Sequence, residues 1–277
     1  MSTHDQRIDI SVAGERIAGT RISPATALPG VLFVHGWGAS QEQYLGRARE
    51  IAGLGCVCLT FDLRGHARTE QQRETVTREE NLCDVLAAYD ALAQQPEVNR
   101  DAIAVVGSSY GGYLAAILTA LRKVRWLGLR APALYKDENW DLPKRKLHEK
   151  QDLAEYRRHL VPVSRNRALQ ACTAYTGDVL LVESECDTII PHVVIASYVA
   201  ACVHARSMTH RIIAGADHAL SEDTSRKAYT SLLVNWLSEM IAGARMASEQ
   251  RDTAVARGGG YLDGFPTKAR PREVPEN

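Results

Sequence analysis

Ser109 lies in the pattern Gly107-Ser108-Ser109-Tyr110-Gly111, directly after an apolar run and before an apolar stretch of helical spacing. A sharp turn from strand to helix brings the backbone close to its neighbours, so glycines are needed two residues before and after the serine. The amide end of the helix that follows favours negative charge developing there. This placement predicts that Ser109 is a nucleophile, with a plain Gly-Ser turn as the alternative. Ser108 lacks glycines at both spacings.

A serine hydroxyl is a poor nucleophile near neutral pH, so it needs a base within hydrogen-bond reach and a third group that orients this base. Attack of the serine on a carbonyl carbon also produces an oxyanion, which preorganised N–H donors must stabilise. The backbone amide that follows the nucleophile, on Tyr110, is one candidate donor. Together these requirements predict acyl transfer through a covalent intermediate.

Alternating segments of the chain predict the elements that position this serine. Residues 7–23 alternate polar and apolar positions around the Ala13-Gly14 turn, which is typical of a β-hairpin. Apolar runs then alternate with segments of helical period, and these runs are 31–35, 56–62, 102–107, 126–129, 179–183 and 208–213. The alternation predicts an α/β fold with a mostly parallel sheet and helices on both faces. Ligand sites of such sheets lie at the carboxyl ends of the strands.

Two segments do not follow this alternation. Residues 132–165 are rich in charge and contain three prolines, which indicates a cap insertion over the strand ends. Residues 245–277 have no apolar periodicity and contain three consecutive glycines and three prolines. We therefore expect a single domain over residues 1–244 and a tail that is mobile or bound to a partner.

Composition excludes several classes of protein. The 277 residues contain 33 Lys+Arg and 33 Asp+Glu, so the strongly basic surface of a nucleic-acid-binding domain is not expected. No apolar stretch reaches the roughly 18 residues of a membrane span, and no apolar signal region follows the first residues. The six cysteines are scattered without metal-ligand spacing, which favours reduced thiols in a cytoplasmic protein. We expect neither a cofactor nor a metal.

Four features in order carry a family resemblance. His35-Gly36-Trp37-Gly38 follows the first parallel strand, Asp62-Leu63-Arg64-Gly65-His66 the second and the serine turn the third, and an acid and a histidine come later. From about residue 31 to 241 the chain resembles the α/β-hydrolase family, in particular small esterases and dienelactone-hydrolase-like and oligopeptidase-like catalytic domains. The resemblance implies a sheet of about eight strands and a serine hydrolase.

The same resemblance implies the remaining site residues. His218 occupies the position of the family's base, in a loop after the run 208–213. Asp187 stands before a proline-opened helix, as the orienting aspartate does, with Glu185 as the alternative. Asp217 could instead be only a turn former. The resemblance also makes the amide of Trp37 the second oxyanion donor.

Several other residues near the strand ends are expected to have structural or pocket-lining roles. His35, Asp62 and the segment 62–67 are interpreted as a scaffold for the site wall, with Ala67 where the family commonly has glycine. A zinc site of His35, His66 and Asp62 matches no usual spacing. His192 and His204 are interpreted as structural. The substrate-pocket candidates are Trp37, Tyr110 and Trp140.

The leading hypothesis is hydrolysis of a carboxylic ester, lactone or thioester through an acyl-enzyme on Ser109. An amidase or peptidase with the same three residues is one alternative, and a ligand-binding protein with little turnover is another. Residues 122–167 hold 13 Lys+Arg and 6 Asp+Glu, which is typical of a solvated helix face. Steering of an anionic acyl substrate is the sharper alternative. The tail could link subunits into a homo-oligomer.

Overall fold

The computed structural model describes residues 3–24 and 28–258. Eight strands form one sheet in the order β1-β2-β4-β3-β5-β6-β7-β8. Their bounds are β1 Thr3–Val12, β2 Glu15–Pro24, β3 Gly30–Val34, β4 Val57–Phe61, β5 Ile103–Ser108, β6 Trp126–Arg130, β7 Asp178–Ser184 and β8 Ser207–Ile213. The strands β4, β3, β5, β6, β7 and β8 pair in parallel, so the predicted α/β fold with a mostly parallel sheet is confirmed.

Strands β1 and β2 form the predicted hairpin and extend the parallel sheet as an antiparallel edge. The two turn residues, Ala13 and Gly14, both have positive φ, at 49° and 81°. A two-residue turn of this conformation matches the twist of the strands that it joins. Strand β2 pairs in turn with β4, which ties the hairpin to the parallel strands.

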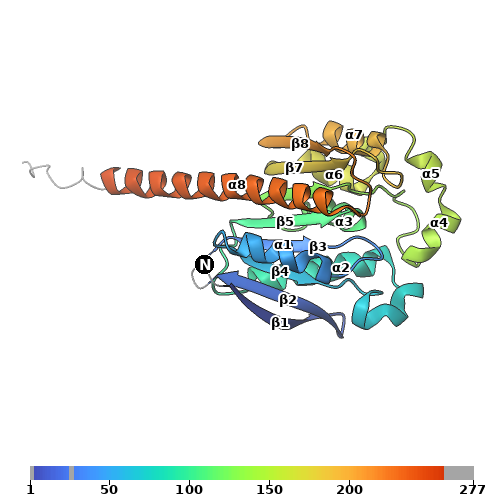
Figure 1. Ribbon diagram of the computed structural model, residues 1–277, viewed down its shortest axis with the longest axis horizontal. Coiled ribbons are helices and arrows are strands. Elements are labelled where there is room, and N and C mark those ends of the chain that lie inside the picture. The colour runs from blue at the N-terminus through green and yellow to red at the C-terminus, as the bar shows by residue number, and fades with distance from the viewer. Residues whose placement is uncertain (1–2, 25–27, 259–277) are drawn as a thin grey trace, which may run out of the picture. The chain divides into compact units, whose positions relative to one another are not determined.

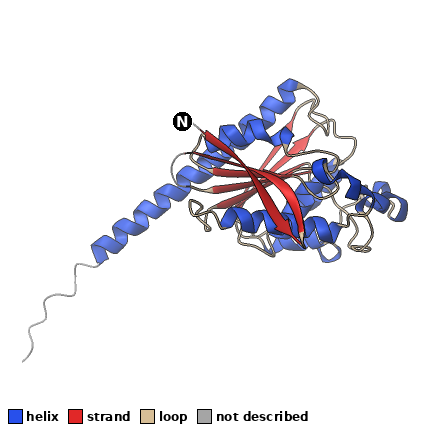
Figure 2. Ribbon diagram, turned by 90° about the horizontal axis from the view of Figure 1, so that it is seen from below, coloured by secondary structure: helices blue, strands red, loops and turns tan. Residues whose placement is uncertain are grey.

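Helices cover both faces of the sheet (Figure 2). They are α1 Glu42–Ala52, α2 Arg78–Ala93, α3 Tyr110–Leu118, α6 Arg167–Ala174, α7 His192–Ala201 and α8 Asp223–Gly258. Helices α2, α3, α6 and α7 pack in a row, each against the next. Helix α1 meets the beginning of α8, where Arg47 Nε donates to Thr230 Oγ1 at 3.0 Å.

The strand order changes direction beside β5. After β4 the chain returns to the other side of β3, so the loops that follow β3 and β5 run apart from each other at the carboxyl ends of their strands. A crevice at such a switch point is where open α/β sheets bind ligands. The serine turn follows β5 and the loop with Trp37 follows β3, so the fold places both at this point.

The insertion forms short helices near the site, namely η2 Lys144–Lys146, α4 Leu147–Lys150, α5 Leu153–Tyr156 and η3 Val163–Arg165. Figure 1 shows α4 and α5 together at one side of the sheet. Thr77 and Pro143 form an isolated antiparallel bridge, and the amide of Lys144 donates to the carbonyl of Val76 at 2.7 Å. These contacts fix the insertion to the segment that precedes α2, beyond the short helix η1 Ala67–Glu74.

The chain forms two compact units, Met1–Ser238 and Glu239–Asn277. Helix α8 continues to Gly258, so the first part of the segment interpreted as a tail is helical. The rest of that segment, residues 259–277, lies outside the described residues, and its mobility and partner contacts stay predictions. Among the helices of the described ranges, none is both long enough and apolar enough to span a membrane.

Candidate active site

Ser109 lies on a strained turn at the end of β5. Its φ of 53° and ψ of −117° are unusual for a residue with a side chain. A Cβ on Gly107 would lie 2.5 Å from the carbonyl oxygen of Gly111, and one on Gly111 would lie 2.3 Å from that of Val34. The two glycines of the pattern are therefore required by backbone contacts, as the sequence predicted. The Ser109 amide donates to the Arg130 carbonyl at 2.9 Å, which holds the turn against β6.

We expect Gly111→Ala to be among the most destabilising single-methyl additions in this chain. The new Cβ would meet two backbone carbonyls, of Val34 at 2.3 Å and of His35 at 2.4 Å, and neither can rotate away. A loss of about 3 kcal/mol or more in unfolding free energy should follow, measurable by urea denaturation. Gly46→Ala is the matched control, because nothing lies within 4 Å of its Cβ position in α1. Equal stability of the two variants would contradict this account.

His218 connects Ser109 to Asp187. The Oγ of Ser109 lies 3.0 Å from Nε2 of His218, and Nδ1 of the same ring lies 2.6 Å from Oδ2 of Asp187. A carboxylate can only accept, so Nδ1 carries the ring proton and Nε2 is left as the acceptor for the serine hydroxyl. The structure thus brings the three predicted residues together, in the geometry by which a base removes a serine proton.

Asp187 is held by its own loop as well as by the histidine. The amides of Ile189 and Ile190 both donate to Oδ1 at 2.8 Å. Burial alone would raise the pKa of Asp187, but the hydrogen bond from His218 and these two amides outweigh it and lower the pKa below its ordinary value. The carboxylate is therefore ionised throughout the neutral range and fixed in orientation.

The predicted oxyanion donors are the backbone amides of Trp37 and Tyr110. Tyr110 is the first residue of α3, so its amide has no partner within the helix. The amide of Trp37 donates to no group in the described residues. Gly36 brings the two loops together, because a Cβ on it would lie 3.3 Å from Cβ of Ser109 and 3.9 Å from its Oγ. The geometry is compatible with the predicted donor pair, whose role stays a prediction.

His35 and Asp62 have structural roles. Nε2 of His35 accepts from the amide of Leu63 at 3.0 Å, and its Nδ1 lies 2.8 Å from the carbonyl of Gly36. Asp62 accepts from both the amide and the side chain of Gln41, each at 2.8 Å. Burial lowers the pKa of His35, so the ring stays neutral while it ties the Trp37 loop to the loop after β4.

His66 and Ala67 shape the same wall. Nε2 of His66 accepts from the amide of Gly38 at 3.0 Å, which leaves Nδ1 protonated beside the carbonyls of Leu63 and Arg64. Ala67 has a φ of 45°, which explains in physical terms why a glycine would suit its position. The interpretation of segment 62–67 as a scaffold agrees with these contacts.

We expect the unfolding free energy to fall as the pH decreases from about 6.5 to 4, because of His66. Burial, and next the nearby His35, lower the pKa of His66 from 6.5 to about 4. Between these values the unfolded chain binds a proton that the folded chain does not, so acid favours unfolding by up to about 3 kcal/mol. Urea denaturation of His66→Gln, which retains an acceptor but does not titrate, should show a shallower pH slope. The exposed His159→Gln is the control, and an unchanged slope in His66→Gln would contradict this assignment.

The aromatic candidates differ in their surroundings. Trp37 is partly buried, and its ring meets those of His66 and Tyr110 edge to face, with centroids 4.7 and 5.7 Å away. Trp140 stacks on Tyr113 at 6.2 Å. Tyr110 is fully buried and its hydroxyl donates to Asn81 at 3.1 Å, so its assignment to the pocket wall is wrong for the side chain.

Sequence reasoning missed a buried lysine beside these rings. Nζ of Lys144 lies 4.8 Å from the ring centres of Trp37 and Tyr135 and 5.0 Å from that of Tyr110. Among the described residues no carboxylate lies within 4 Å of it. Burial lowers the pKa of Lys144. Burial alone would raise the pKa of Tyr135, but the charges of Lys144 and Arg157 outweigh it and lower the pKa of that phenol. In the sequence Lys144 belongs to a charged run, and only the aromatic residues elsewhere indicate that it is buried.

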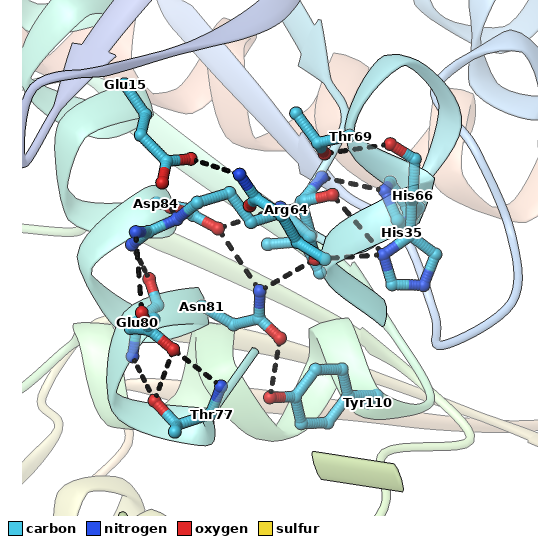
Figure 3. A network of polar contacts seen from close by, with 12 residues as sticks. Glu15, His35, Arg64, His66, Thr69, Thr77, Glu80, Asn81, Asp84 and Tyr110 are labelled. Carbon is cyan, nitrogen blue, oxygen red and sulfur yellow. Dashed lines mark hydrogen bonds and ion pairs between the residues drawn. The ribbon is translucent and has the colours of Figure 1, made fainter. Parts of the chain in front are cut away.

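A buried polar network reaches Tyr110, the residue after Ser109 (Figure 3). Arg64 Nε donates to Asp84 at 2.6 Å, and Asn81 donates to the same carboxylate at 3.1 Å. Asn81 also accepts from the hydroxyl of Tyr110. Burial raises the pKa of Tyr110 well above its ordinary value, so its hydroxyl remains a donor. The network links the loop after β4 to the first residue of α3, through helix α2.

The remaining candidates contact partners other than Ser109. His192 contacts Glu183 at 2.8 Å, and His204 contacts the carbonyl of Thr173 at 2.8 Å, so both have structural contacts. Glu185 accepts from the amide of Gly215 and is exposed, which removes the alternative to Asp187. Asp217 accepts from Ser221, as a turn former does. No cluster of three metal-ligating side chains is found in the part of the chain that the structure describes.

Comparison with known proteins identifies a family. A model of the alpha/beta hydrolase family matches residues 31–231. Two curated relatives match a shorter segment: a hydrolase, pyiE, of Pyricularia grisea is 37% identical over 117 residues, and an alpha/beta hydrolase, ucsC, of an Acremonium species is 30% identical over 115 residues. Each match covers 39% of this chain, and only 25% and 22% of those relatives.

Solved structures extend the likeness over most of the chain. The dienelactone hydrolase of Anabaena variabilis has a TM-score of 0.62 at 20% identity, with 86% of this chain and 98% of that chain covered. Est1E of Butyrivibrio proteoclasticus, solved with ferulic acid bound, has a TM-score of 0.66 at 17% identity, with 85% and 99% covered. The acylaminoacyl peptidase of Pyrococcus horikoshii has a TM-score of 0.65 at 15% identity, with 85% of this chain and 41% of that chain covered. At these identities the likeness establishes the fold alone.

Proposed function

The chain belongs to the alpha/beta hydrolase family, and we propose that it is a serine hydrolase that cleaves carboxylic esters through an acyl-enzyme on Ser109. The observation that carries the proposal is the connected series Ser109–His218–Asp187, with contacts of 3.0 and 2.6 Å. The names of the similar proteins, which include a dienelactone hydrolase and an acylaminoacyl peptidase, support hydrolysis of an acyl bond in general.

In the proposed first step, Oγ of Ser109 attacks the acyl carbon and its proton passes to Nε2 of His218. The carbonyl oxygen becomes an oxyanion that accepts from the amides of Trp37 and Tyr110. Asp187 stabilises the protonated ring without taking the proton. The carbon–oxygen bond to the leaving group then breaks, and His218 returns the proton to the departing alkoxide.

In the second step, water takes the place of the serine as the nucleophile and attacks the acyl-enzyme. His218 takes a proton from the water, the hydroxide adds to the acyl carbon, and Oγ of Ser109 leaves with the proton that His218 holds. The products are a carboxylic acid and an alcohol, so atoms balance without a cofactor. Hydrolysis of an amide in the same site would have to expel an amine, which is a poorer leaving group than an alcohol.

Labelling with a fluorophosphonate probe tests the mechanism directly. The probe should attach to one residue, and peptide mass spectrometry should locate it on Ser109 rather than Ser108. Comparing p-nitrophenyl acetate with an aminoacyl p-nitroanilide then separates an esterase from a peptidase. Lack of labelling together with lack of ester turnover would refute the proposal and favour a ligand-binding protein.

We further propose that the ester carries a negative charge. Much of the basic segment 122–167 is neutralised by acids outside it, as in the pairs Arg122–Asp90 and Arg167–Glu79. The buried Lys144 has no acidic partner within 4 Å among the described residues; it contacts the phenol of Tyr135 and lies beside Trp37. Added salt should therefore lower kcat/KM more for the p-nitrophenyl monoester of succinic acid than for neutral p-nitrophenyl butyrate. Equal salt slopes would remove the anionic-substrate proposal and leave the esterase proposal intact.

A further inference from the structure

A cavity lies beside the loop that follows the candidate base His218. Its volume is about 320 Å³, near the lower limit of roughly 300–1,000 Å³ typical of small-molecule sites. Helix α1, the ends of β5 and β6, the residues after His218 and the beginning of α8 form its walls. The residues that give it its chemical character are Arg47, Ser108, Arg130, Arg226, Tyr44 and Tyr229.

Arg130 is the most deeply buried charge of this cavity, with only 6% of its surface exposed. Its three hydrogen bonds all go to neutral acceptors: Nε donates to Oγ of Ser108 at 2.7 Å, Nη2 to the carbonyl of His218 at 2.6 Å and Nη1 to Oγ of Ser184 at 3.4 Å. The guanidinium also lies 6.0 Å from the ring centre of Tyr229. No described carboxylate lies within 4 Å of its guanidinium. A guanidinium has five N–H donors, so two remain. A buried charge without a counterion is costly, and an anion in the cavity would remove that cost.

Arg47 approaches the same cavity from α1. Its guanidinium lies over the ring of Tyr229 at 4.6 Å and near that of Tyr44 at 5.6 Å, and its Nε donates to Thr230. These aromatic contacts fix the side chain but supply no negative charge. Its two terminal nitrogens contact no carboxylate in the described part of the chain.

Arg226 approaches from the beginning of α8. Its Nη1 donates to the carbonyls of Leu220 and Ser221, in the loop after the candidate base. Its ion-pair partner Asp223, at 3.6 Å, is 62% exposed and lies one turn earlier on the helix surface. Three guanidinium groups from three different elements therefore share one cavity, and among the described residues they have a single, exposed carboxylate.

We propose that this cavity binds a phosphate group. Guanidinium groups pair with phosphate oxygens through parallel hydrogen bonds, and three of them around one cavity suit a tetrahedral dianion better than a single carboxylate. The buried hydroxyl of Tyr229 is a further neutral donor, because burial raises its pKa to about 12. The ligand is either free inorganic phosphate or the phosphate of a small organic ester. This site does not depend on the proposed hydrolase activity.

Titration calorimetry with inorganic phosphate tests the proposal, at an ionic strength held constant with sodium chloride. Saturable binding is expected in the full chain and in Ser109→Ala, so failure of the hydrolase proposal would not affect this result. Arg47→Met and Arg226→Met should each weaken binding about tenfold, since each removes a charge-assisted contact. Arg49→Met is the matched control on α1, because Arg49 pairs with Asp5 on the surface and should not affect binding.

The outcomes separate the alternatives. The proposal would be overturned if phosphate gave no more heat than a titration with sodium chloride. It would also be overturned if Arg49→Met and Arg47→Met weakened phosphate binding equally. Circular dichroism of each variant shows that the fold is retained. Tighter binding of glycerol 3-phosphate than of inorganic phosphate assigns the site to a phosphate ester, and the reverse order assigns it to free phosphate. Acetate should bind at least tenfold more weakly than phosphate, and equal affinity would overturn the choice of a dianion.

Discussion

Ser109→Ala should lower kcat for p-nitrophenyl acetate by about 10⁶-fold, the size of effect seen when a serine hydrolase loses its nucleophile. The reason is geometric, since the Ser109 hydroxyl is the one that lies 3.0 Å from Nε2 of His218. The substitution removes an oxygen from a partly exposed turn and leaves the backbone contacts of Ser109 in place, so stability should change little. Steady-state rates and fluorophosphonate labelling both measure the effect.

Ser108→Ala is the matched control for this experiment. Ser108 precedes Ser109 directly in the chain, but its hydroxyl faces the other side of the strand end. There it accepts a hydrogen bond from Arg130 at 2.7 Å. We expect it to retain turnover within about tenfold. Retention of activity in Ser109→Ala together with its loss in Ser108→Ala would reverse the assignment of the nucleophile.

The parts of this molecule that depend on local backbone geometry could be predicted from sequence. The six apolar runs match the parallel strands to within one or two residues. Five of these strands are buried along their whole length and therefore need continuous apolar residues, whereas β8 is mostly exposed. The pattern around Ser109 was informative for a similar reason, since Gly107 and Gly111 have no room for a Cβ. Family resemblance then supplied His218 and Asp187, which spacing alone left among several late histidines and acids.

The interactions that could not be predicted join charged or aromatic residues far apart in the chain. The position of Lys144 in a basic run predicts a solvated side chain. In the structure it is buried against aromatic rings from three other segments. Arg130 is the last residue of strand β6, and its contact with the carbonyl of His218, 88 residues later in the chain, appears only in the folded structure. Tyr110 was assigned to the pocket because of its position next to Ser109, whereas the direction of its side chain depends on Asn81 in helix α2.

Asp187→Asn should produce the second largest loss, about 10⁴-fold in kcat, as expected when the orienting carboxylate of such a triad becomes an amide. The amides of Ile189 and Ile190 both donate to Oδ1, so the carbonyl oxygen of the new asparagine must face them. Its NH₂ group then occupies the place of Oδ2, 2.6 Å from Nδ1 of His218. Two donors cannot face each other, so the ring proton moves to Nε2 and the base facing Ser109 is lost.

Glu185→Gln is the control for that substitution, because Glu185 is exposed and accepts only from the amide of Gly215. The comparison should use kcat and the rate of fluorophosphonate labelling, both of which require deprotonation of Ser109. Because the asparagine keeps both loop amides satisfied, Asp187→Asn should lower these rates without a large loss of stability. Activity of Asp187→Asn within tenfold of the unsubstituted chain would show that another group orients His218, and that the 2.6 Å contact has only a structural role.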